Sequence, residues 1–272
     1  MSIENMENME NNVQGNKAEE EMIKKLFGTE NLIVLISLRT KQPFVVCDND
    51  TLDDQILVFD KPEYAHTALT RHREEGNPVE VAVIAQKDRM NFYASLCTLG
   101  VNCVVFNAYS EVEERFQLSD FIGAPKTMPN GQPWIDNPSL YLTAAYFMQA
   151  IARNKAKEET AELTELREEI VGHYANSTFI ILFNEKGQLP ALRFENGDSY
   201  HPIFTDMFEA VKFKADQKVS MGAIPSVKIP TILAQEVKGV VINPNTVCLQ
   251  LPIIRKPLDP SKVPGMPTEE NK

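Results

Sequence analysis

The first group of residues that could carry chemistry is the acidic loop DNDTLDD at positions 48–54. Such a loop suggests calcium binding, because Ca²⁺ prefers carboxylate and carbonyl oxygens. An EF-hand loop that started at Asp48 would need glycine at its sixth position and glutamate at its twelfth. The chain has Asp53 and Phe59 there. We therefore interpret this segment as a solvated acidic turn.

The histidines and cysteines also form no catalytic or metal-binding set. His66 and His72 are six residues apart on a predicted helix and do not share a face. Asp198, Ser199 and His201 have the residue types of a catalytic triad, but strand alternation points neighbouring side chains to opposite faces. The cysteines form no C-x-x-C pair, and we interpret them as isolated reduced thiols: Cys47, Cys97, Cys103 and Cys248.

The glycines form no phosphate-binding loop. They match neither G-x-G-x-x-G nor G-x-x-x-x-G-K-[ST], and no G-x-S-x-G elbow of a serine hydrolase is present. The sequence therefore predicts no catalytic, cofactor-binding or metal-ligating residue, no cofactor, and a protein that is not an enzyme.

The charge of the chain restricts its partners. A formal net charge of -11 repels phosphate backbones and anionic headgroups, so we expect neither nucleic acid nor membrane as partner. The uncharged stretch 137–152 is too short and polar to span a bilayer. Residues 1–20 have no basic start and no apolar run, which predicts a cytoplasmic address rather than secretion. The expected partner is another protein, and the oligomeric state stays open.

The elements that must position these residues occur twice. Similar segments recur in the same order, 31–35 with 178–182, 56–60 with 201–205, and 104–107 with 240–243. Each copy is predicted to contain a leading helix, strands ending at Phe59 or Phe204, a following helix, and a last buried strand. The following helix of the second copy would bury Phe208, Val211 and Ala215. The predicted fold is α+β, with two tandem related modules, each a mixed, mainly antiparallel sheet packed with helices.

Composition divides the chain further. We expect a disordered acidic tail at 1–16, a first, diverged module at 17–120, a proline-containing linker at 121–137, a second module at 138–255, and a disordered proline-rich tail at 256–272. Trp134 is interpreted as an apolar anchor of the linker. Apolar residues at helical spacing from Leu140 to Ile151 and from Leu163 to Ile170 predict two amphipathic helices or one long kinked helix.

The helix after Phe204 also has a predicted start. Thr205 stands between a strand and an amphipathic run, where its hydroxyl can accept from the N–H groups of the first turn. In the first copy Asp60 takes that place, followed by Pro62 and Glu63 as in a capping box. We therefore predict that Thr205 and Asp60 cap their helices.

The second copy resembles a known family. The segments Leu189-Pro190, Gly197-Asp198, 202–205 (PIFT) and 240–244 (VVINP) are similar to the N-terminal domain of the SseB (enhanced serine sensitivity) family, over about 140–251. The first copy departs from this pattern, with Asp60 in place of Thr205 and Ala108 in place of Pro244. The resemblance implies a cytoplasmic bacterial protein of unknown molecular function, and brings no catalytic residues with it.

Two functions follow from these observations. Duplication, an acidic surface and the lack of reactive motifs favour a non-catalytic interaction or regulatory protein. The alternative is a small-molecule sensor or unrecognised enzyme linked to amino-acid or sulfur metabolism, as the family name suggests. A deep pocket with convergent polar groups would favour the alternative, and a shallow surface with an exposed apolar patch the first.

Overall fold

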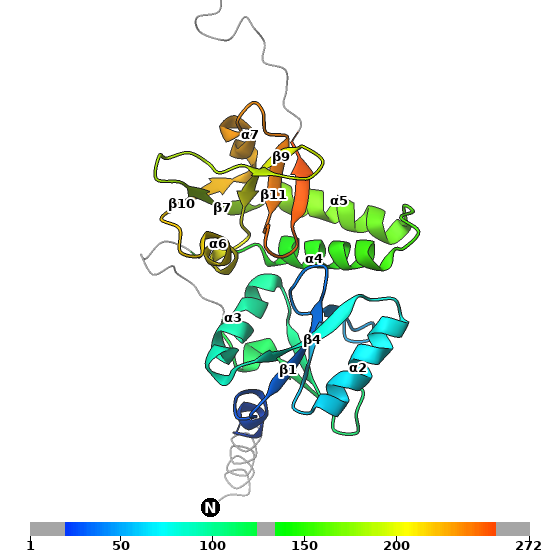
Figure 1. Ribbon diagram of the computed structural model, residues 1–272. Helices are drawn as coiled ribbons and strands as arrows, with labels where there is room; N and C mark the ends of the chain where they lie inside the picture. Colours follow the sequence, from blue (N-terminus) through cyan, green and yellow to red (C-terminus); the bar gives the residue numbers. More distant parts are fainter. Residues whose placement is uncertain (1–19, 124–133, 254–272) are drawn as a thin grey trace, which may run out of the picture.

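The computed structural model describes residues 20–123, here the first half, and 134–253, the second half (Figure 1). The predicted tails at 1–16 and 256–272 and most of the predicted linker lie outside the described residues. The fold is α+β, as predicted, with mixed, mostly antiparallel sheets packed against helices. No helix in the described part of the chain is long and apolar enough to cross a membrane.

The first half forms one six-stranded sheet with the order β4-β1-β3-β5-β6, in which β2 also pairs with β3. β3 and β5 are parallel and the other pairs antiparallel. The β-branched run of β1 is buried almost throughout, as expected of a central strand covered on both faces. After a helix at 20–27 the elements are β1 (Leu32–Ser37), β2 (Val45–Cys47), β3 (Asp54–Phe59), α2 (Pro62–Glu74), β4 (Val79–Ile84), η1 (Gln86–Asp88), α3 (Arg89–Leu99), β5 (Cys103–Phe106), β6 (Glu114–Gln117) and η2 (Leu118–Asp120).

The second half begins with two helices and continues with a sheet in two parts, β10-β7 and β12-β11-β9-β8. A bridge between Ile180 and Phe204 joins the parts. β9 and β11 are parallel and the other pairs antiparallel. The elements are α4 (Pro138–Arg153), α5 (Ala161–Ala175), β7 (Thr178–Phe183), β8 (Leu192–Arg193), β9 (Ser199–Ile203), α6 (Met207–Lys214), β10 (Ser220–Pro225), η3 (Ser226–Lys228), α7 (Ile229–Ile232), β11 (Gly239–Ile242) and β12 (Leu249–Pro252).

The strand pairings of the two halves correspond in order and direction. The bridge from Ile180 to Phe204 has its counterpart in the pair of Ile33 with Phe59. Each parallel pair ends at an asparagine with positive φ, Asn107 at 54° and Asn243 at 46°. In each half, the first strand of the parallel pair, β3 or β9, is followed by a helix, α2 or α6. A common origin of the halves stays a prediction that these correspondences favour.

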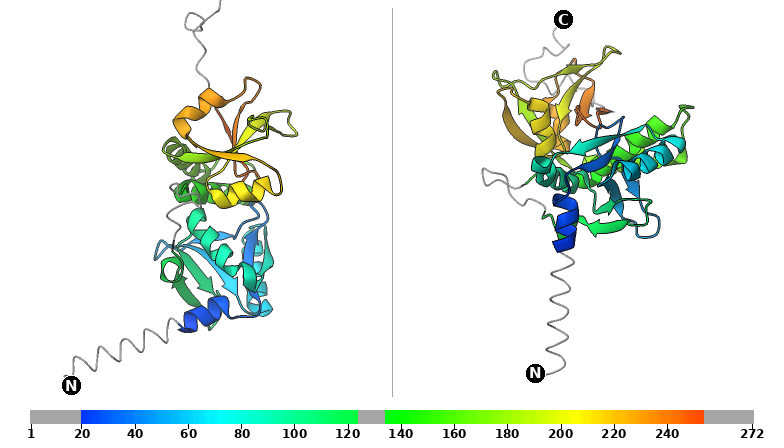
Figure 2. Two further views of the ribbon diagram at one scale, coloured as in Figure 1. Left: turned by 90° about the vertical axis from the view of Figure 1, so that its left-hand side faces the viewer. Right: turned by 60° about the horizontal axis from the view of Figure 1, so that its bottom comes forward.

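The helix α4 lies between the two sheets with α5 packed beside it (Figure 1), and Figure 2 shows this pair in green from two further directions. They are two separate helices, one of the two predicted arrangements. One continuous hydrophobic core runs from the first half through Leu140, Tyr141 and Ala144 of α4 into the second half. Gly100, which ends α3 with φ 93°, permits the close approach, because a Cβ there would lie 2.7 Å from the Pro138 carbonyl oxygen. By its contacts α4 therefore belongs to both halves.

The buried face predicted for the helix after Phe204 is wrong. α6 ends at Lys214, and Ala215 follows it with φ 45°. Val211 is exposed, and the fully buried apolar residue of α6 is Ala210. The helix begins at Met207, so the side that packs on β7 is set by Met207 and Ala210 rather than by Phe208.

Candidate functional site

The acidic segment 48–54 forms a turn, in agreement with its interpretation. Asp48 Oδ1 accepts from the backbone N–H groups of Asp50 and Thr51, and Oδ2 pairs with Arg115. The hydrogen bond from the Arg115 guanidinium, with those from the backbone, lowers the pKa of Asp48 to about 2. This aspartate is therefore engaged in shaping the loop and the edge of the sheet.

The triad-like residues do not meet. His201 Nδ1 lies 2.6 Å from the Pro190 carbonyl oxygen, and Nε2 accepts from the Ala234 N–H. Asp198 instead accepts from Lys238 at 2.7 Å. Both ring nitrogens of His201 are thus held by the backbone. Among the described residues, no group of three His, Cys, Asp or Glu side chains could hold a metal ion.

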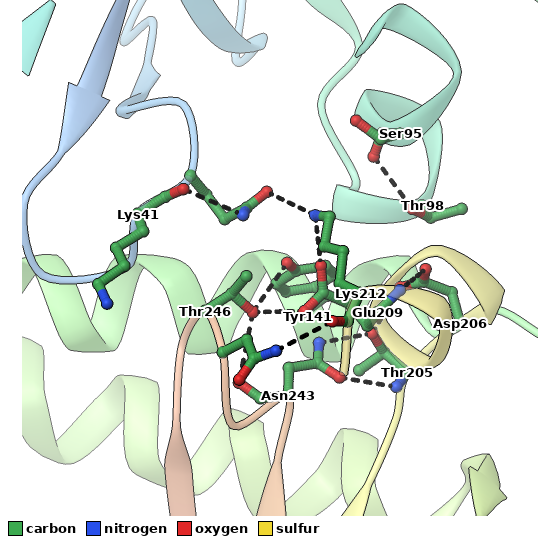
Figure 3. Close-up of polar contacts among 12 residues, drawn as sticks. Lys41, Ser95, Thr98, Tyr141, Thr205, Asp206, Glu209, Lys212, Asn243 and Thr246 are labelled. Atoms are coloured by element: carbon green, nitrogen blue, oxygen red, sulfur yellow. Dashed lines mark hydrogen bonds and ion pairs between the residues drawn. The ribbon is translucent and has the colours of Figure 1, made fainter. Parts of the chain in front are cut away.

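A buried polar network lies where β9 and β11 end and α6 begins (Figure 3). Asn243 Oδ1 accepts from the Thr205 N–H at 3.0 Å, and its Nδ2 donates to the Thr205 hydroxyl at 2.7 Å. That hydroxyl donates to Asp206 Oδ2 at 2.7 Å. Thr246 donates to Glu209 Oε2 at 2.6 Å and accepts from Tyr141 of α4. The network ties the second sheet to α6 and α4.

The network holds two carboxyl groups out of solvent. Asp206 is 0% exposed and Glu209 2%. Burial, together with the charge of the neighbouring Glu209, raises the pKa of Asp206 to about 6, although the hydrogen bond from Thr205 acts to lower it. Lys212 reaches Glu209 Oε1 at 2.7 Å and comes within 3.5 Å of Gln42 in the first half. Because the carboxyl groups are enclosed by protein, we assign the network to structure.

The capping role predicted for Thr205 is wrong by one residue. Asp206 is the N-cap of α6, and its Oδ1 accepts from the Glu209 N–H at 3.1 Å. Asp60 does not cap either, since α2 starts after Lys61 without a side-chain cap. The Asp60 N–H donates to Asn107 Oδ1, as the Thr205 N–H donates to Asn243 Oδ1. Thr205 and Asp60 are equivalent, but their shared task is this backbone contact.

The corrected role changes what substitutions at Thr205 should do. We expect Thr205→Ala to lower the free energy of unfolding by about 1–2 kcal/mol, because it removes a hydroxyl that bridges Asp206 and Asn243. Thr205→Asp should cost more, since it buries another carboxylate beside Asp206. Urea unfolding would measure both, with Thr205→Ser as the control that keeps the hydroxyl. A Thr205→Asp protein as stable as wild type would contradict this assignment.

A second feature is open to solvent. A cleft of about 640 Å³, here called the central cleft, lies between β2 and the end of α2 on one side and α4 and α5 on the other. It is lined by apolar, polar and acidic side chains: Phe44, Val45, Val46, Cys47, Asn49, His72, Glu75, Asn77, Tyr146, Gln149, Ala150, Arg153, Glu162, Glu165, Leu166 and Glu169. Its volume is within the range of ligand-binding sites.

Most polar groups of the central cleft have partners in the protein. Gln149 accepts from the Val45 N–H at 3.1 Å and donates to the Val45 carbonyl at 3.0 Å, as a neighbouring strand would. Tyr146 donates to Asp54 at 2.6 Å. Arg153 binds both oxygens of Glu162, at 2.8 and 3.0 Å. These contacts fix the cleft walls, because each joins elements on opposite sides or stiffens the α4–α5 pair.

Two buried side-chain atoms of residues that line the cleft have no hydrogen-bond partner among the described residues. Asn77 is 5% exposed, and its Oδ1 has no hydrogen-bond partner among the described residues. His72 is 4% exposed; its Nε2 lies 3.0 Å from the Tyr109 hydroxyl, and its Nδ1 is 3.2 Å from Glu75 Oε2 without hydrogen-bond geometry. Burial lowers the pKa of His72, so the ring is neutral near pH 7. A buried acceptor without a partner is costly unless something else supplies a donor.

The rim of the central cleft is acidic. Glu162, Glu165 and Glu169 follow one another at helical spacing along α5, and Glu75 stands at the end of α2. Arg153 is the cation that faces them within the lining. The sequence analysis missed this site. The spacing of the three glutamates could have revealed an acidic helix face, but the pairing of that face with α2 is set only by the fold.

Comparison with known proteins adds no functional information. No family model matches the chain, and no curated protein matches it. Two solved structures align over most of its length: Tic22 from Plasmodium falciparum, with 12% identity over 80% of this chain and 90% of that one, and Anabaena Tic22 (protein transport), with 8% identity over 81% and 92%. The TM-score is 0.21 for both, so neither similarity supports an argument about this chain.

Proposed function

We propose that this chain is a non-catalytic, SseB-like interaction protein that receives part of another protein in the central cleft. The observation that carries the proposal is the open cleft of about 640 Å³, with exposed glutamates along α5 at its rim and walls held together by its other polar groups. Such a site offers contacts rather than reactive groups. The family resemblance, with the bacterial and cytoplasmic origin that it implies, is part of the proposal.

The chemistry of the cleft supports binding over catalysis. Among the residues that line the cleft, Cys47 has a side chain that could act as a nucleophile. Burial, together with the nearby Asp54, raises the pKa of its thiol. A thiol with a raised pKa is a weak nucleophile near neutral pH, because the thiolate is the reactive form. His72, the general-base type, is buried against Tyr109. Neither group is therefore prepared for a reaction.

A small-molecule sensor is the second candidate, favoured by the cleft volume of about 640 Å³. The exposure of the rim agrees better with a partner protein as the occupant of the cleft. The Glu162 and Glu75 side chains are 54% and 47% exposed, so an occupant stays in contact with solvent at the rim. Small-molecule sites usually enclose most of their ligand.

Charge reversal at the rim tests the proposal. We expect tagged wild-type protein to retain a partner in constant stoichiometry from its native host, and Glu165→Arg to lose it, because the variant puts a cation on the α5 face of the cleft. Mass spectrometry of the eluted proteins measures this. Glu168→Arg is the matched control, since Glu168 is exposed on the same helix but does not line the cleft. Equal recovery by wild type and Glu165→Arg would refute the proposal.

A further inference from the structure

We infer that the free edge of the first sheet, strand β4, pairs with β4 of a second copy of this chain to give a reversible dimer with two-fold symmetry. β4 contributes no residue to the lining of the central cleft, so the inference goes beyond the function proposed above and does not depend on it. It rests on the hydrogen-bonding groups, the side chains and the charge of this edge.

The backbone of β4 has unpaired hydrogen-bonding groups. In the described part of the chain, β4 pairs on one side with β1 and has no strand on the other. The Leu38 N–H donates to the Pro78 carbonyl at 2.9 Å next to the first pair of this ladder, and antiparallel bonds alternate from residue to residue. The even-numbered residues of β4 therefore bond to β1. Val81 and Val83 direct their N–H and carbonyl groups outward.

The free part of the edge is short and symmetric. At its start, Arg73 Nε donates to the outward Val79 carbonyl at 3.0 Å and occupies that acceptor. Two donors and two acceptors remain, at Val81 and Val83, on either side of Ala82. A two-fold axis that passes Ala82 perpendicular to the sheet places Val81 of one copy opposite Val83 of the other. This register forms four backbone hydrogen bonds between the copies.

The side chains of the same two residues are apolar and exposed. Val81 and Val83 are 41% and 61% exposed, whereas Val79, on the same face, is fully buried in the cluster that α2 forms with the sheet. Residues directly opposite in an antiparallel pair lie on the same face. The four valines of a dimer therefore form one patch across the line where the two strands meet. A second copy covers valines that an isolated chain leaves in water.

The charge of the strand fits this register. Glu80, the charged residue of β4, is exposed. In the dimer it lies opposite Ile84 of the second copy, and the two Glu80 positions are about 13 Å apart along the strands. This separation exceeds the Debye length of about 8 Å at physiological salt, so the two carboxylates repel each other weakly. The edge of one copy is thus complementary to the same edge of another.

The other long sheet edges lack these properties. β10, at the edge of the second half, contains Gly222 and ends at Pro225, and both residues disfavour strand pairing. β6 carries Glu114 and Arg115, which form ion pairs with Lys25 and Asp48. Charged side chains on an edge hinder its pairing with another chain. β4 is therefore the edge to which we assign the contact.

Sedimentation velocity of the full chain over a concentration series tests the inference. The contact is smaller than the roughly 1,200–2,000 Å² of stable interfaces, so we expect a dissociation constant on the order of 0.1 mM. Added salt should strengthen the dimer, because it screens the repulsion between two chains of net charge -11. Amide hydrogen exchange at Val81 and Val83 should slow as the dimer forms. A chain that stays monomeric up to about 0.5 mM would overturn the inference.

Two double variants test the register. Val81→Lys/Val83→Lys should abolish the dimer, because like charges then face each other across the two copies. Val81→Lys/Val83→Glu should retain it, since each lysine then faces a glutamate. Val211→Lys/Val227→Lys is the matched control, because both valines are exposed in the second half, away from β4, and it should dimerise as wild type does. Circular dichroism checks that each variant folds. Equal dimerisation by the two β4 variants, or loss of the dimer in the control, would contradict the proposed contact.

Discussion

Asn243→Ala should lower the free energy of unfolding by roughly 3 kcal/mol or more, the sum of two effects. Alanine is strained at the positive φ of 46° that Asn243 adopts after β11. It also removes two buried hydrogen bonds to Thr205 and leaves the Thr205 N–H without its acceptor. For a chain of this length the melting temperature should fall by about 6–12 °C. Differential scanning calorimetry measures this loss.

Two further variants divide the effect. Asn243→Gly relieves the backbone strain but not the loss of hydrogen bonds, so its cost should lie between wild type and Asn243→Ala. Asn245→Ala is the control, because Asn245 is exposed in the same turn and donates only to the Lys212 carbonyl. Asn107→Ala should repeat the loss in the first half, where Asn107 accepts from the Asp60 N–H at 3.1 Å. An Asn243→Ala protein no less stable than Asn245→Ala would contradict the assigned role.

Asp206→Asn should stabilise the protein at neutral pH. The pKa of Asp206 is raised from 3.8 to about 6, so the folded state binds its proton more tightly than the unfolded state. The proton-linked stability is present below the unfolded pKa, is lost as pH rises to about 6, and is absent at pH 7. The resulting penalty is on the order of 3 kcal/mol at pH 7. Asparagine carries no charge and can still accept from the Glu209 N–H as the cap of α6. Its amide nitrogen cannot accept from the Thr205 hydroxyl as Asp206 Oδ2 does, but this loss of about 1 kcal/mol is smaller than the charge penalty.

Urea unfolding at a series of pH values checks this sign. The stability advantage of Asp206→Asn over wild type should be largest at pH 7–8 and should shrink as pH falls below about 6. Asp216→Asn is the matched control, because Asp216 is exposed shortly after the same helix. An advantage that did not change with pH, or one shared by Asp216→Asn, would show that the Asp206 charge is not the cause.

The sequence predicted those parts of the fold that hydrophobic runs determine. The recurring apolar segments at 178–182 and 240–243 correspond to β7 and β11, whose uninterrupted apolar residues are buried on both faces. β4 and β10 were not predicted. These strands lie at sheet edges and bury few of their residues, so their apolar signal is weak.

The two sites depended on contacts that the sequence does not contain. The cap of α6 differs by one residue from the prediction because Thr205 and Asp206 both suit the position, and only the bond from Asn243 fixes Thr205 elsewhere. The central cleft joins Asn77 to α4 and α5, which are distant in sequence. Neither the unpartnered Oδ1 of Asn77 nor its buried location has a local signal, since both follow from how distant elements meet around the cleft.

The position of α4 bears on how the chain acquires its structure during synthesis. Gln149 of α4 bonds to the Val45 N–H and carbonyl of β2, and Tyr146 of α4 donates to Asp54 of β3. A ribosome that has released residues 20–123 has therefore exposed a half whose core lacks its α4 contacts. The first half cannot complete these contacts until α4 has been synthesised. The strands of the second half, in contrast, are synthesised after α4. Cutting the chain at 121–137 would not give two self-sufficient proteins.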